Sequence, residues 1–210
     1  MEEVLREYEK PDTDEEPLIC MDEAAPQILA DKVDPLPMRP GVACREDDQY
    51  ERLGVQSLFM FLRPLSGWRR VAIRKRRTAK DWAVEIRKLL LVDFPKAKKI
   101  RLVCDNLNTH KRAALYAAFG AEEGLPLAER LEIHYTPLHG SWLNMAELEL
   151  SVLSRQCLDR RFNSLQKFAD EILAWQTQRN DAIATIQWRF RTQDARDKLG
   201  HLYPKPTVTF

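Results

Sequence analysis

The sequence lacks several features that would place it in a membrane or in an oxidising compartment. No apolar run approaches the roughly 20 residues of a membrane span, and the acidic start lacks the basic-then-apolar pattern of a signal peptide. Cys20, Cys44, Cys104 and Cys157 form no CxxC pair, which argues against a cysteine-bound zinc. Cys20 and Cys104 lie in apolar runs, so we expect buried thiols in a reducing cytoplasm.

Charge is distributed unevenly although the net charge is only +1. Residues 1–52 hold 16 acidic and 6 basic side chains, whereas residues 53–210 hold 16 acidic and 27 basic ones. A basic body suggests a polyanionic partner, while ordinary surface charge is the alternative explanation. At 44% apolar residues, a chain of 210 residues can bury a substantial core.

Apolar runs bounded by turn and cap residues predict alternating strands and helices. We expect strands at 17–21, 54–62, 68–74, 100–104 and 131–135, and helices at 79–93, 111–130, 142–158 and 164–186. This order favours a mixed α/β sheet with helices on its faces. We expect 1–16 to be an acidic leader, 17–160 a catalytic domain and 161–210 a helical extension packed on it. Within the domain, 24–52 is proline-rich and predicts an irregular insertion.

Acidic side chains follow two of the predicted strands and occupy one predicted helix. Asp22 is followed directly by Glu23, and neighbouring strand residues point to opposite faces, so only one of them can face a given site. Asp105 ends the strand at 100–104. On the helix, for which Ser141 is a plausible N-cap, Glu147 and Glu149 lie about 200° apart. Periodicity does not decide which of the two would join the aspartates.

Three carboxylates brought together would repel one another, and a divalent cation would offset the repulsion. Oxygen ligands favour Mg²⁺ or Mn²⁺, and two such ions can assist both the attacking and the leaving oxygen at a phosphodiester. Taken singly, each Asp is more typical of a turn and Glu147 of a solvated helix face. It is their combination that indicates a nuclease-like site.

The motifs around these acids resemble those of DDE transposases of bacterial insertion sequences, in the mariner superfamily. The resemblance rests on Leu-Ile-Cys-Met-Asp22-Glu23, on Leu-Val-Cys-Asp105-Asn-Leu-Asn-Thr-His110, and on Tyr-Thr-Pro-Leu-His139-Gly-Ser-Trp-Leu-Asn144-Met-Ala-Glu147. It extends through Leu-Pro-Met-Arg-Pro-Gly at 36–41, Leu-Ser-Gly-Trp-Arg at 65–69 and Trp188-Arg-Phe. It thus covers nearly the whole chain.

The resemblance implies a ribonuclease-H-like mixed five-stranded sheet flanked by helices. It also implies that Asp22, Asp105 and Glu147 form the catalytic, metal-binding triad for Mg²⁺ or Mn²⁺, with two ions expected. Asn106, His110, His139 and Asn144 are candidates for orienting these ligands or contacting DNA. A further set of cations is a candidate for binding the DNA backbone: Arg69, Arg70, Arg74, Lys75, Arg76 and Arg77.

The implied activity is DNA cleavage and strand transfer at insertion-sequence ends, by a protein of the bacterial cytoplasm associated with the nucleoid. Only 21 residues precede Asp22, too few for a helix-turn-helix domain of the kind that family members carry. We therefore expect a helix-turn-helix partner chain or upstream reading-frame product, with a homodimer also possible. The alternatives are a non-catalytic DNA-binding or assembly remnant and a stand-alone ribonuclease-H-type nuclease.

Overall fold

A five-stranded mixed sheet organises the protein in the computed structural model, which describes residues 1–33, 36–43, 45 and 47–203. The strands are β1 (Leu18–Ala24), β4 (Ser57–Arg63), β5 (Trp68–Arg74), β6 (Ile100–Cys104) and β7 (Leu131–Tyr135). Their order is β5-β4-β1-β6-β7. The β1–β4 and β4–β5 pairs are antiparallel, whereas β1–β6 and β6–β7 are parallel. The predicted mixed five-stranded α/β sheet is confirmed.

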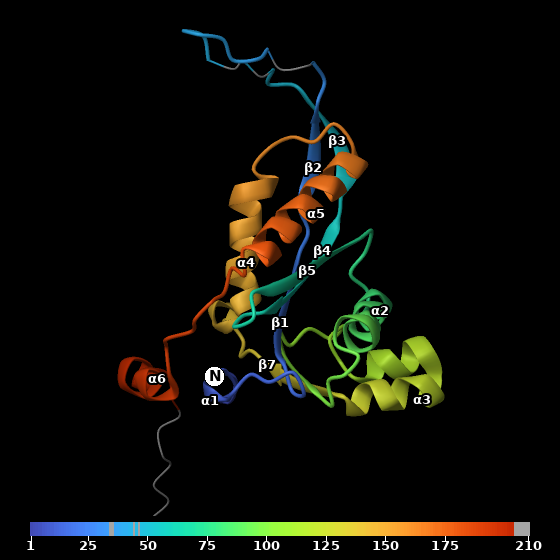
Figure 1. Ribbon diagram of the computed structural model, residues 1–210, viewed down its shortest axis with the longest axis vertical. Coiled ribbons are helices and arrows are strands. Elements are labelled where there is room, and N and C mark those ends of the chain that lie inside the picture. The colour runs from blue at the N-terminus through green and yellow to red at the C-terminus, as the bar shows by residue number, and fades with distance from the viewer. Residues whose placement is uncertain (34–35, 44, 46, 204–210) are drawn as a thin grey trace, which may run out of the picture.

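Two helices cover one face of the sheet (Figure 1). Helix α2 (Ala79–Lys88) starts at a capping box between Thr78 and Asp81 and continues as a π-helical segment, η1 (Leu89–Asp93). Helix α3 (Ala113–Glu129) is kinked at Gly120, where φ is 75°. Their apolar side chains pack with those of β1, β4 and β6 in one core cluster.

The other face is covered by α4 (Met145–Leu153), its π-helical extension η3 (Ser154–Leu158), α5 (Leu165–Asp181), α6 (Thr192–Leu199) and the N-terminal α1 (Glu2–Glu9). Figure 1 shows α1 beside α6, so segments from both ends of the chain lie together. Val4 and Leu5 are fully buried. Residues 1–16, expected as an acidic leader, thus include a helix that packs into the core through these two side chains. Residues 204–210 of the expected C-terminal extension lie outside the described residues.

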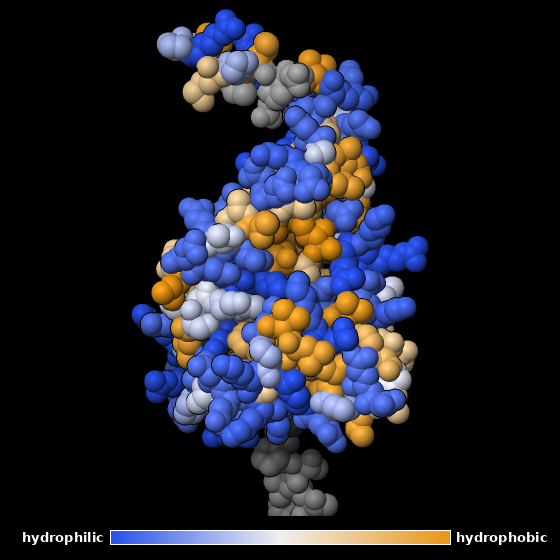
Figure 2. All heavy atoms as spheres, turned by 45° about the vertical axis from the view of Figure 1, so that its right-hand side comes forward, coloured by the Kyte–Doolittle hydropathy of each residue, from blue (hydrophilic) through white to orange (hydrophobic). Residues whose placement is uncertain are grey.

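The chain segment that connects β1 to β4 forms a two-stranded arm, which projects from the body (Figures 1 and 2). Strands β2 (Gln27–Asp31) and β3 (Tyr50–Val55) pair antiparallel within the segment 24–52. The expectation of a wholly irregular insertion is therefore wrong, and so is that of one strand over 54–62, because Gln56 separates β3 from β4. At the end of the β2–β3 ladder far from β1 and β4, where Asp31 pairs with Tyr50, Arg161 ties the arm to the body: its guanidinium lies 2.8 Å from Oδ1 of Asp31.

Two helix boundaries also differ from those expected. Ser141 lies in the 3₁₀ turn η2 (Ser141–Leu143), and Asn144 is the N-cap of α4. Helix α5 begins at Ser164 as expected, but it ends at Asp181 instead of 186, and α6 occupies part of the tail. Within the described part of the chain, no helix has the length and apolar character needed to cross a bilayer.

Candidate active site

The topology of the sheet brings Asp22 and Asp105 to the same edge. Strands β1 and β6 run parallel, with Cys20 opposite Val103, and each Asp lies two residues beyond that pair. Residues two apart on a strand share a face. Cys20 and Val103 both belong to the core cluster that includes α4. Both carboxylates therefore lie on the α4 face, near the carboxyl ends of the two parallel strands.

Asn144 attaches the third acid to this edge. Its side-chain amide donates to the carbonyl oxygen of Met21 at 2.8 Å, and its side-chain oxygen accepts from the backbone N–H of Ala146 at 3.1 Å. One buried side chain thus caps α4 and ties the helix start to the residue before Asp22. Glu147 lies in the first turn of α4. Asn144 is only 1% exposed, and its contacts with Met21 and Ala146 position the helix from inside.

Burial and neighbouring charges both act on the carboxyl group of Asp22. Burial raises its pKa to about 6, and the nearby charges of Asp105, Glu147 and Glu23 add to that rise. The backbone N–H of Glu23 donates to Oδ1 of Asp22 at 2.8 Å and partly offsets it. A bound cation would stabilise the ionised form of Asp22 in these surroundings.

Glu149 belongs to the body of the fold and not to this site. It is fully buried, and its Oε1 lies 2.9 Å from Nε of Arg69 and 2.5 Å from Nε of Arg179. In contrast, Oε2 of Glu147 is buried without a hydrogen-bond partner among the residues the structure describes. Of the two glutamates that helical periodicity left open, Glu147 is the one whose charge acts on Asp22.

The burial of Arg69 and Arg70 contradicts their predicted role in binding the DNA backbone. Arg69 is fully buried beside Glu149, and Arg70 is 7% exposed. Nε of Arg70 lies 2.6 Å from Asp93, and its guanidinium also pairs with Glu85. These arginines neutralise internal acids, so phosphates cannot reach them.

The remaining basic residues of this run differ in their surroundings. Arg74 is half-buried and its guanidinium lies 2.6 Å from Glu85. Lys75, Arg76 and Arg77 are exposed in the loop that leads into α2. These three remain candidates for backbone contacts.

His110 joins the sheet's two faces behind the acids. Its Nδ1 lies 2.5 Å from Oδ1 of Asp105, and its Nε2 lies 2.9 Å from Oε1 of Glu23. The ring stacks on Trp82, with centroids 5.8 Å apart. Although burial lowers the pKa of His110, its contacts with Asp105, Cys104 and Glu23 raise it to about 11. His110 is therefore a buried cation that holds Asp105.

Glu23 has a place in the site that the sequence did not indicate. It lies on the face opposite Asp22, where it contacts His110 instead of joining the triad. Its side chain is 4% exposed. The adjacent Asp22 and Glu23 could have indicated this role. Neighbouring strand residues point to opposite faces, and a buried Glu23 requires a cation on its own face.

A cavity of about 280 Å³ adjoins Asp105 and contains two of the predicted contact residues. Asn106 and His139 line it together with Leu107, Thr136 and Pro137. His139 is exposed with a positive φ of 60°, and Asn106 accepts a hydrogen bond from Lys111. Of the four predicted auxiliary residues, Asn106 and His139 face this opening, whereas His110 and Asn144 support the acids from inside.

The residues present fit divalent cations with oxygen ligands. Three carboxylates converge, one has a raised pKa and another has an unpartnered buried oxygen. In the described part of the chain, the one group of three donors all within 4.8 Å of one another is Glu7, Glu132 and His134. The oxygens of Asp22, Asp105 and Glu147 are therefore not all within 4.8 Å of one another.

The fold and this acidic edge define a ribonuclease-H-like nuclease domain. The model of the DDE superfamily endonuclease family matches residues 17–169, which include all three acids, and the chain belongs to that family. The predicted membership is confirmed. Among curated protein sequences, none matches the chain.

Solved structures with the same fold come from the Mos1 transposase. They are the Mos1 mariner paired end complex with Mn (15% identity, TM-score 0.57), the Mos1 transposase paired-end complex with left transposon end (15%, 0.58) and the Mos1 Strand Transfer Complex (14%, 0.57). Each alignment covers 87% of this chain and 54% of the other. The predicted ribonuclease-H-like fold is confirmed, and the chain spans about half the length of these proteins.

Proposed function

We propose that this chain is the catalytic domain of a DDE transposase, which cleaves DNA phosphodiesters and joins the freed 3′-hydroxyl to target DNA. Asp22, Asp105 and Glu147 would hold two Mg²⁺ or Mn²⁺ ions. When bound, these ions would supply the charge that lowers the pKa of the attacking hydroxyl and stabilises the leaving oxygen. The single observation that supports this most strongly is the convergence of the three carboxylates at one sheet edge.

Each auxiliary residue has a task in this proposal. The buried cation His110 fixes the orientation of Asp105, and Glu23 fixes His110 in turn. Asn144 sets the distance between Glu147 and Asp22 by capping α4 on the Met21 carbonyl. Asn106 and His139 line the opening beside Asp105, where a DNA strand would enter.

The partners follow from the same proposal. DNA is the substrate, and the exposed Lys75, Arg76 and Arg77 would contact its phosphates without reading sequence. We propose, from the family resemblance, that recognition of the element's ends involves a helix-turn-helix partner chain or upstream reading-frame product. A homodimer would hold two ends together. The proposed location is the bacterial nucleoid in the cytoplasm.

A strand-transfer assay tests this function. The chain is incubated with a labelled duplex ending in a 3′-hydroxyl, supercoiled plasmid and Mn²⁺, with Asp105→Asn as the inactive control. Plasmid joined to the label in the wild type alone supports a transposase. Nicking without joining would indicate a nuclease that only cuts. DNA binding with neither product would indicate a non-catalytic remnant.

A further inference from the structure

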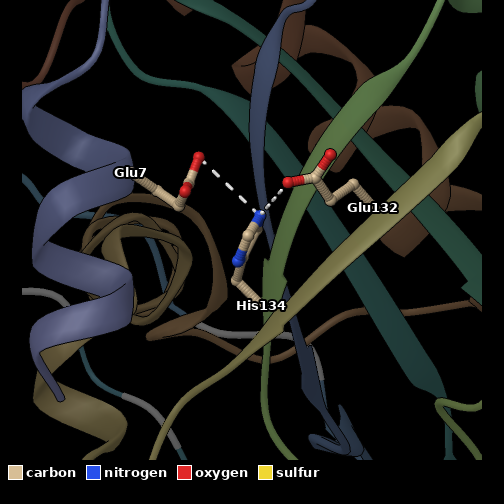
Figure 3. A group of neighbouring side chains, drawn as sticks. All are labelled: Glu7, Glu132 and His134. Atoms are coloured by element: carbon tan, nitrogen blue, oxygen red, sulfur yellow. Dashed lines mark ion pairs between the residues drawn. The ribbon is translucent and has the colours of Figure 1, made fainter.

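A second cluster of potential ligands lies between α1 and the edge strand β7 (Figure 3). Glu7 projects from α1, while Glu132 and His134 project from the same face of β7. One donor atom from each lies within 4.8 Å of the other two. Glu7 is 3% and His134 is 6% exposed. Glu7 also precedes the segment 17–169 that matches the family, so this cluster is distinct from the triad.

The orientation of His134 leaves one ring nitrogen free to bind an ion. Its Nδ1 lies 2.9 Å from Oε1 of Glu3, a contact that places the proton on Nδ1. Its Nε2 is buried and has no hydrogen-bond partner in the described ranges. A carboxylate on one imidazole nitrogen, with the other nitrogen directed into a group of acids, is the arrangement found around histidines that bind metals.

The separations around Nε2 match those between ligands of one ion. Nε2 lies 3.2 Å from Oε1 of Glu132 and 3.7 Å from Oε2 of Glu7. Figure 3 shows both carboxylates directed at this nitrogen. Ligands about 2.0–2.1 Å from a tetrahedral ion stand roughly 3.3 Å apart. Neither contact has hydrogen-bond geometry, so a proton on Nε2 would point at neither oxygen.

Neighbouring cations pair with the cluster but leave these ligand atoms facing one another. Lys10 lies 2.5 Å from Oε1 of Glu7, and Lys99 lies 3.1 Å from Oε2 of Glu132. Arg101 is 3.2 Å from Oε2 of Glu7 and therefore shares that oxygen. Glu132 is 35% exposed and lines a cavity of about 330 Å³ together with Lys10, Lys99 and Arg101.

From this geometry we infer that Glu7, Glu132 and His134 form a binding site for a transition-metal dication of the Zn²⁺ class. One imidazole and two carboxylates suit Zn²⁺ better than Mg²⁺, and three protein ligands leave the fourth position to water. The ion links α1 to β7. Tyr8 of α1 donates a hydrogen bond to the Leu143 carbonyl at 2.6 Å, next to the Asn144 cap. The site thus fixes a helix that supports α4.

Zn²⁺ titration by calorimetry tests the site, in an Asp105→Asn background that removes a ligand of the other centre. We expect one Zn²⁺ per chain, a rise in melting temperature with Zn²⁺, and visible absorption bands of four-coordinate Co²⁺ on substitution. Adding His134→Gln or Glu132→Gln should weaken Zn²⁺ binding at least tenfold. Glu3→Gln removes only the carboxylate on Nδ1, and about tenfold weaker binding is expected.

Matched controls separate the removal of a ligand from the removal of an ion pair. Lys99→Gln breaks the same Lys99–Glu132 pair but keeps the ligand, so Zn²⁺ affinity should be unchanged or higher. His139→Gln removes an exposed histidine outside the cluster, and the affinity for Zn²⁺ should be unchanged. The inference is overturned if the Asp105→Asn protein binds no Zn²⁺, or if His134→Gln and Lys99→Gln bind it equally well. Since the readouts are affinity, melting temperature and Co²⁺ absorption, they do not depend on DNA cleavage.

Discussion

Glu23 and His110 contact each other at 2.9 Å, behind the sheet edge where the acidic triad lies. Through Nδ1 of His110 the contact reaches Asp105, so Glu23 acts on a proposed metal ligand without facing the metal. Glu23→Gln should therefore weaken Mn²⁺ binding about 10–100-fold while leaving the fold intact. Calorimetry with Mn²⁺ measures this. Lys111→Gln, which removes the hydrogen bond to the neighbouring Asn106, is the control and should bind Mn²⁺ almost normally.

The raised pKa of His110 predicts how stability depends on pH. Because its pKa in the folded state, about 11, lies above the ordinary 6.5, the charged ring stabilises the fold fully below pH 6.5. That contribution declines as the pH rises toward 11. In urea unfolding of metal-free protein, the wild type should exceed His110→Gln most at pH 6 and progressively less at pH 8 and 10. A difference that grows with pH would contradict the charged state.

Removing the charge of Asp22 should raise the stability of the metal-free protein and abolish its activity. Its pKa of about 6 exceeds the ordinary 3.8, so ionisation in the folded protein carries a penalty that grows between pH 4 and pH 6 and is constant above. Asp22→Asn should therefore stabilise metal-free protein at pH 8 by roughly 1–3 kcal/mol. Urea unfolding with a chelator present measures this gain. DNA cleavage should be abolished. Stability equal to or lower than that of the wild type would show that the ionised carboxylate of Asp22 carries no such penalty.

Glu147 and Glu149 form a matched pair on one helix with different expected effects. Glu149→Gln removes the partner of the buried Arg69 and Arg179 and should cost about 3–5 kcal/mol of unfolding free energy. Glu147→Gln removes no ion pair and should abolish cleavage with little change in stability. Urea unfolding and a nicking assay on both variants provide the comparison. An inactive Glu149→Gln protein, under conditions where it remains folded, would contradict this division.

The exposed basic loop is the part of the predicted DNA track that the structure leaves accessible. Replacing Lys75, Arg76 and Arg77 with Gln should reduce the slope of log affinity against log salt by about 0.9 for each phosphate that the protein no longer neutralises. Fluorescence anisotropy with a non-specific duplex at several salt concentrations measures the slope. Folding should be unaffected because these side chains lie in solvent. An unchanged slope would show that these three residues do not contact phosphates and that DNA binds to another face of the protein.

Much of the architecture could be predicted because the signals are local. The strands at 68–74, 100–104 and 131–135 have the expected boundaries. The turn at 64–67 marks the start of the first, and Asp105 follows the end of the second. Cys20 and Cys104 are buried thiols as expected. Asp105 directly follows β6 as expected, whereas β1 continues through Asp22 and Glu23 to Ala24 instead of ending at Met21.

What could not be predicted depends on partners distant in sequence. Arg69 looks like a DNA-binding cation until Glu149 and Arg179 are placed beside it by the packing of α4 and α5. Asn144 replaces Ser141 as the cap because the Met21 carbonyl, 123 residues away, accepts from its amide. The burial of α1 likewise depends on β7 and α6. The sequence shows which residues are charged or able to cap a helix, but it does not show which distant residues they contact.

The most direct test of the central claim is calorimetric titration of Mg²⁺ and Mn²⁺ with a DNA duplex present, on His134→Gln and on His134→Gln with Asp105→Asn. The first variant removes the proposed Zn²⁺-class site, so that the measured binding of Mg²⁺ or Mn²⁺ comes from the triad alone. We predict that the single variant binds up to two ions per chain and that Asp105→Asn abolishes this binding. Equal binding by both variants, or none by either at millimolar ion with DNA present, would contradict a metal-dependent active site at Asp22, Asp105 and Glu147.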